Sequence, residues 1–209
     1  MSRSRYPNSA IGAIGEGVEV NIDRVGPQND LIVSQLHGKY TEQTRSKHVY
    51  HAASQAATTT TVALATTYTG LCLSNPAASG KNLIPLMFSA ALSVAPAGIA
   101  PMAVMAGYLA AGVTTHTTPL TIYNGFLADA TAAVGKADAA CTLVGSGSGA
   151  PHVVMPFLGG FTAGALFGTS PAICELHGSI IIPPGGWVAI YTLTVAVGLF
   201  GVIWEEVSE

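Results

Sequence analysis

The sequence predicts an all-β protein, an antiparallel β-sandwich preceded by an extended N-terminal arm. Several runs rich in Thr, Val, Ile and Leu have the length of a strand, and β-branched residues favour strands over helices. Turn signals separate these runs, drawn from 24 glycines and 12 prolines in a chain of 209 residues. Short strands with frequent turns and little helical pattern are typical of a sandwich or a barrel.

The chain divides by pattern into an arm, residues 1–30, and a sandwich domain, residues 31–209. The arm is charged at both ends and glycine-rich in its middle, and Gly26-Pro27 ends it. Residues 102–112 fit either a helix or a strand, because Ala and Met favour a helix and Gly does not. Strands are expected at residues 31–37, 48–52, 58–65, 69–75, 175–182, 187–197 and 198–207, and one long strand or two shorter ones at 82–95. Residues 120–126 contain an Asn-Gly turn signal, and residues 145–151 are expected to form a flexible loop.

Charged residues make up only 9% of the chain, against about 25% in an average soluble protein. Three long segments, 82–128, 139–174 and 176–204, contain none. A neutral surface of this extent is expected to be covered by copies of the chain or by partners, or to lie in a membrane. The net charge of −3 argues against a nucleic-acid-binding protein, which needs a basic face.

Because of two apolar segments, a small membrane protein remains an alternative interpretation. Three prolines interrupt residues 84–113, and a proline inside a helix costs about 3 kcal/mol. Residues 187–204 are uncharged and have Trp at both ends, close to the minimum for a spanning helix. Their β-branched residues, with Gly198 and Gly201, favour two strands instead. No signal peptide is expected, because the first ten residues are polar.

The cysteines and histidines predict no metal site and no disulfide framework. Cys72, Cys141 and Cys174 are odd in number and widely spaced, which is typical of buried thiols in a reducing compartment. His48 and His51 could share a metal on a helix, but their region has a strand pattern, which turns them to opposite faces. We therefore expect no metal and no cofactor.

No catalytic motif stands out, so the sequence predicts a protein that is not an enzyme. Glu205 and Glu206 are adjacent, but neighbouring residues on a strand face opposite ways and cannot form an acid/base pair. Residues 77–82 resemble the end of a phosphate-binding loop, yet Asn82 stands where a Ser or Thr would hold magnesium. The nucleophile motif Gly-x-Ser-x-Gly is absent from the sequence, and GSGSG at 145–149 places a serine after glycine only by its low complexity.

Four segments carry a resemblance to a known group of proteins. LHGKYTEQ (36–43), ATTTTVALATTYTGLCLSNP (57–76), GSIIIPPGGWVAIYT (178–192) and the terminal WEE (204–206) are similar to a group of tailed-bacteriophage proteins. The resemblance implies a virion structural protein, similar to capsid cement or decoration proteins built on jelly-roll sandwiches. It further implies a homotrimer on the virion shell, whose partners are copies of itself and the major capsid protein of the same phage.

The resemblance carries over no functional residue. The residues expected at an interface are therefore chosen from this sequence alone. Arg3 and Arg5 lie in the arm and are expected to anchor it to carboxylates of a neighbour through bidentate contacts. Trp187 and Trp204 are expected at an interface as well. Neither a nucleic acid nor a membrane is expected as a partner.

A receptor-binding or fibre protein of the same virion remains the other structural alternative. Such a protein should expose aromatic residues on its loops. The uncharged loops around Tyr123 and Phe126, and around Phe157 and Phe161, are the candidates.

Overall fold

The computed structural model describes residues 24–25, 31–32, 38–62, 66–108, 115–143, 153–161 and 172–209, with only the backbone described for 24–25, 31–32 and 153–161. The chain divides into two compact units, Met1–Lys39 and Tyr40–Glu209. In the first unit, β1 (Arg24–Val25) pairs antiparallel with β2 (Leu31–Ile32). The strand expected to open the sandwich at residue 31 therefore pairs inside the first unit instead.

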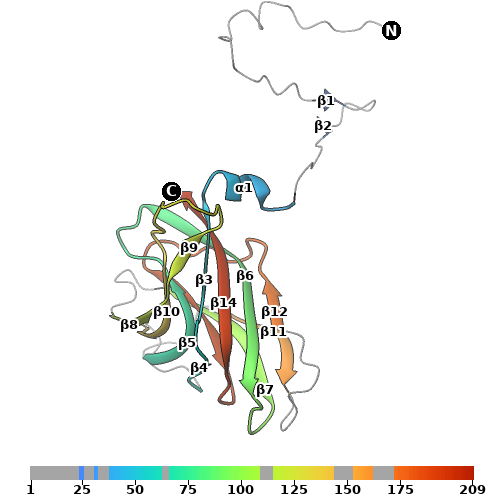
Figure 1. The fold of residues 1–209 in the computed structure, drawn as a ribbon, viewed down its shortest axis with the longest axis vertical. Coiled ribbons are helices and arrows are strands. Elements are labelled where there is room, and N and C mark those ends of the chain that lie inside the picture. The colour runs from blue at the N-terminus through green and yellow to red at the C-terminus, as the bar shows by residue number, and fades with distance from the viewer. Residues whose placement is uncertain are drawn as a thin grey trace, which may run out of the picture. The chain divides into compact units, whose positions relative to one another are not determined.

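The second unit consists of two antiparallel sheets packed against each other (Figure 1). One sheet has the order β11-β7-β13-β5-β10-β8, and the other has the order β12-β6-β14-β3-β9, with β4 also paired to β14. The elements are α1 (Thr41–Arg45), β3 (Val49–Ala53), β4 (Thr58–Thr59), β5 (Thr67–Ser74), β6 (Lys81–Val94), β7 (Ala100–Tyr108), β8 (Thr115–Pro119), β9 (Ile122–Asn124), β10 (Lys136–Thr142), β11 (Val153–Phe161), β12 (Ala172–Glu175), β13 (Gly186–Thr192) and β14 (Val197–Ser208). The predicted antiparallel β-sandwich is confirmed.

The strand order is that of a jelly roll. Eight strands form two four-stranded layers, β3-β14-β6-β12 and β5-β13-β7-β11. Successive strands of this set cross from one layer to the other, except β7 and β11, which are neighbours in one layer. The first strand thus pairs with the last, and two interleaved Greek keys result. The connection from β7 to β11 carries β8, β9 and β10, which widen both sheets at one edge.

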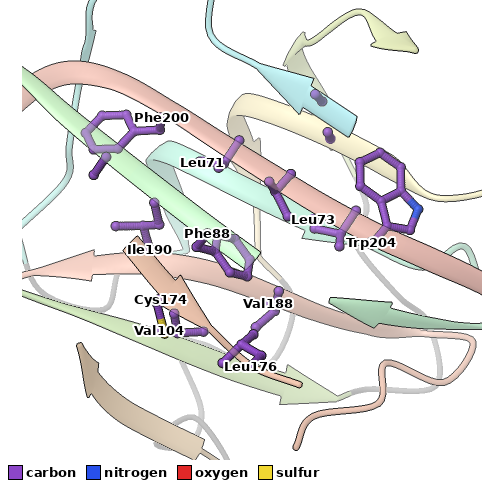
Figure 2. Close-up of a cluster of buried hydrophobic side chains, with 14 of the residues drawn as sticks. Leu71, Leu73, Phe88, Val104, Cys174, Leu176, Val188, Ile190, Phe200 and Trp204 are labelled. Carbon is purple, nitrogen blue, oxygen red and sulfur yellow. The ribbon is translucent and has the colours of Figure 1, made fainter. Parts of the chain in front are cut away.

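The main core lies between the two sheets and follows the alternation of the strands. On β14, the side chains of Phe200, Val202 and Trp204 point inward, and the residues between them are more exposed. Leu71 and Leu73 of β5 meet them from the opposite sheet, as Figure 2 shows. This is the period of two that a sheet with one buried face requires.

A second hydrophobic cluster covers the outer face of the sheet that contains β13. Its buried members are Tyr68, Cys72, Met105, Cys141, Leu143, Trp187 and Ala189. On β13, Trp187 and Ala189 alternate with Val188 and Ile190 of the main core, so this strand is buried on both faces. A strand buried on both faces is apolar throughout, which explains why this segment resembles a spanning helix.

Of the segment 102–112, which fitted either a helix or a strand, the described residues 102–108 form a strand. β7 occupies Ala100–Tyr108, between β11 and β13, and most of its residues are buried. Neighbours on both sides satisfy its backbone groups, and this outweighs the helix preference of its Ala and Met residues. In the described part of the chain, no helix has the length and apolarity needed to cross a membrane.

Candidate functional site

The residues expected at an interface fall into two groups. Arg3 and Arg5 lie outside the described residues. Trp187 and Trp204 lie inside the second unit, where they are 1% and 0% exposed. Their indole rings are therefore buried within the chain itself, and packing there accounts for both residues.

Trp187 packs across β7 at a position that only glycine fits. It stands opposite Gly107 in the antiparallel pairing of β13 with β7. A Cβ atom at Gly107 would overlap the indole ring of Trp187. The ring therefore lies close against the backbone of Gly107 and belongs to the second cluster.

Trp204 belongs to a buried polar arrangement at the C-terminal end of β14. Its ring stacks on Tyr50 with centroids 6.0 Å apart, and its Nε1 atom donates to the Oε1 atom of Glu206 at 3.3 Å. The same Oε1 atom accepts the backbone N–H groups of Val134 and Gly135 at 2.8 and 2.9 Å. Lys81 Nζ lies 3.2 Å from the other carboxylate oxygen of Glu206. Glu206 therefore joins β14, β6 and the segment before β10, which is a structural role.

The two histidines considered as metal ligands, His48 and His51, have different surroundings. The ring of His51 stacks on Tyr123 at a centroid distance of 5.9 Å, and His48 is exposed. Among the residues that the structure describes, no group of three or more His, Cys, Asp or Glu could hold a metal ion.

One buried carboxylate is only half satisfied. The Oδ2 atom of Asp138 lies 2.6 Å from Nδ1 of His116, which joins β10 to the edge strand β8. The Oδ1 atom has no hydrogen-bond partner, and the side chain is fully buried. Burial raises the pKa of Asp138, and the hydrogen bond from His116 opposes this only in part.

Strand β9 and the loop after it expose the aromatic residues expected there. Tyr123 is 52% exposed, Phe126 is 45% exposed and Leu127 is 81% exposed. A shallow hollow of about 490 Å³ adjoins Tyr123 and Leu127. Lys47 fixes the loop, because its Nζ atom lies 2.5 Å from Asp129 and 5.8 Å from the centre of the Phe126 ring. The side chains of Phe157 and Phe161, the other candidates, are not among those that the structure describes.

The two ends of the sandwich differ in chemistry. At the end with α1 and the C-terminus lie the described charged residues Glu42, Arg45, Lys47, Lys81, Asp129, Glu206 and Glu209. At the opposite end the chain turns between β6 and β7 and between β13 and β14 (Figure 1), and residues 94–99 and 193–196 are uncharged. We call this the apolar end and define it by its exposed side chains Val62, Val94, Ile99, Leu193 and Val195. These residues could not be predicted from the sequence, because strand pairing alone brings the turns together.

Comparison with known proteins gives no match: no family model fits the chain, no curated protein is similar in sequence and no solved structure is similar in fold. The jelly-roll assignment therefore rests on the strand order of this chain.

Proposed function

We propose that the protein is a structural component of a bacteriophage virion, a capsid cement or decoration protein that binds the assembled shell as an oligomer. The observation that carries the proposal is the division of a jelly-roll body into a charged end and an uncharged end with exposed apolar side chains. A body of this kind has two different surfaces, one for its own copies and one for a charged partner. Jelly rolls are frequent in viral capsids, which supports the role by analogy of fold.

The proposed role has a simple thermodynamic basis. A protein that binds only the assembled lattice stabilises that lattice by its binding free energy at every site. The scarcity of charge helps, because uncharged surfaces come together without the cost of removing water from unpaired charges. In this proposal the protein is a homotrimer in the virion, its second partner is the major capsid protein, and Arg3 and Arg5 of the arm make the ionic contacts.

The experiment that tests the proposal uses the virion itself. Mass spectrometry of purified particles should find the protein at a fixed copy number. Particles that lack it should lose their DNA or unfold at a lower temperature, and adding the purified protein should restore the melting temperature of the shell. Particles that contain none of the protein, or that gain no stability from it, contradict the proposal.

The exposed aromatic loop supports a second candidate, a receptor-binding protein of the same virion. Tyr123, Phe126 and Leu127 present apolar and aromatic surface next to a hollow, the usual setting for a bound ligand. Replacing Tyr123 and Phe126 by Ala should then abolish adsorption to cells and leave the shell as stable as before. If the variant particles adsorb normally, this candidate is excluded.

A further inference from the structure

The apolar end is held in one conformation by threonine hydroxyl groups that are turned inward. The hydroxyl oxygens of Thr60 and Thr192 lie 2.7 Å apart, and Thr60 Oγ1 also accepts the backbone N–H of Ala196 at 3.0 Å. Thr194 donates its hydroxyl to the carbonyl oxygen of Ile99 at 2.7 Å, which ties the β13–β14 turn to the β6–β7 turn. The polar groups are therefore used within the protomer, and the apolar side chains face outward.

These side chains form a large part of the exposed apolar surface. Twelve large hydrophobic side chains are exposed among the described residues, and the five of the apolar end are among them. Ile99 is 66% exposed, Leu193 is 58% exposed and Val94 is 53% exposed. A parallel bridge between Val62 and Thr192, and the pairing of Val94 with Val197, place the residues of this end side by side. Such clusters on a soluble protein mark an interaction surface.

The absence of charge from this end indicates which partner covers it. Around a symmetry axis, equivalent residues of identical copies lie close together, so any charge would meet its own sign. Residues 53–66, 94–99 and 193–196 contain no Asp, Glu, Lys or Arg. Contacts with a different partner generally use complementary charges to guide association, and this end offers none.

We propose that the apolar end is the contact between copies of this chain around a common symmetry axis, with Ile99 and Leu193 at its centre. The proposal deepens the function proposed above and rests on its claim that the protein acts as an oligomer. It leaves the charged end of each copy free, so that self-association and shell binding use opposite ends of the body.

The test compares charge variants of the full-length protein by sedimentation equilibrium. Leu193→Lys places like charges together at the axis, and its dissociation constant should rise by more than about tenfold over the wild type. The matched control is Leu127→Lys, which changes an exposed leucine at the charged end and should associate as the wild type does. Circular dichroism of each variant shows whether the fold is retained, as expected for exposed positions.

A mixture experiment tests whether equivalent residues meet. Leu193→Lys and Leu193→Glu should each dissociate alone, and an equal mixture of them at low salt should associate again. A wild type that is monomeric at high concentration, a Leu193→Lys variant that associates normally, or a mixture without recovery would each overturn the proposal. Sedimentation of the same variants with particles measures shell binding separately. A failure of self-association is therefore distinguished from a failure of the proposed function.

Discussion

Trp204 and Glu206 lie two positions apart on β14 and point to the same side, so that the indole Nε1 atom of one donates to the buried carboxylate of the other at 3.3 Å. The carboxylate also accepts two backbone N–H groups from the segment before β10. A single acidic side chain thereby connects parts of the chain that are far apart in sequence. It links β14 of one sheet to the segment that leads into β10 of the other sheet.

Replacing Glu206 by Ala should lower the free energy of unfolding by about 3 kcal/mol or more. The substitution leaves the N–H groups of Val134 and Gly135 and the indole N–H of Trp204 without their acceptor, and each unsatisfied buried donor costs about 1–3 kcal/mol. Urea unfolding measures the difference. The control is Glu205→Ala at the adjacent, more exposed position, which should change stability by much less. Equal losses in the two variants would contradict the role given to Glu206.

Replacing Gly107 by Ala should destabilise the protein by about 1–3 kcal/mol, the usual cost of overpacking. The added methyl group would overlap the ring of Trp187, and backbone pairing between β7 and β13 prevents the strands from moving apart. Gly98→Ala is the matched control, since the nearest atom to its new Cβ is Thr194 Cγ2 at 3.8 Å, an ordinary contact. Guanidinium unfolding curves of both variants provide the comparison. A Gly107→Ala variant as stable as the control would show that the ring can move away.

Local pattern in the sequence was sufficient for the fold class but not for the burial of its strands. Runs of β-branched residues and Gly/Pro turns identified β3, β5, β6, β13 and β14, because those preferences act within a few residues. Strands β8, β10 and β11 were not predicted, and the strand expected at 175–182 overlaps β12 only at Glu175. The outer cluster around Trp187 was missed, since a strand buried on both faces shows no alternation. The burial of Glu206 was missed for a different reason: its partners Lys81 and Gly135 are 125 and 71 positions away.

The first unit provides a further prediction. Deleting residues 1–25 should leave the melting temperature of the sandwich nearly unchanged, because the second compact unit begins only at Tyr40. Attachment to the shell should weaken, since Arg3 and Arg5 are the proposed ionic contacts. Bound protein is counted after sedimentation with particles that lack the wild-type copy. Full occupancy by the truncated protein would show that the arm has no part in attachment.

Asp129 should contribute stability that is lost in acid. Hydrogen bonds from Lys47 and Thr131 lower the pKa of Asp129 to about 2, below the value of about 3.9 for an unfolded chain. The unfolded state therefore takes up the proton first, and this contribution, fully present above about pH 4, disappears as the pH falls toward 2. Asp129→Asn should remove that part of the pH dependence. Urea unfolding at a series of pH values from 2 to 5 tests this, and parallel curves for both proteins would contradict it.

Asp138 should have the opposite effect, because burial raises its pKa in the folded state. The folded protein then retains the proton when the unfolded chain has already released it. Stability should therefore fall as the pH rises from about 4, the unfolded value, through the raised pKa of Asp138. Asp138→Asn should remove this fall, since the amide stays uncharged in the same position and keeps an oxygen facing His116. The unfolding free energy of both proteins, measured by urea across this range, tests the sign. A wild type whose stability rises relative to the variant over the same interval would show that His116 outweighs the burial of Asp138.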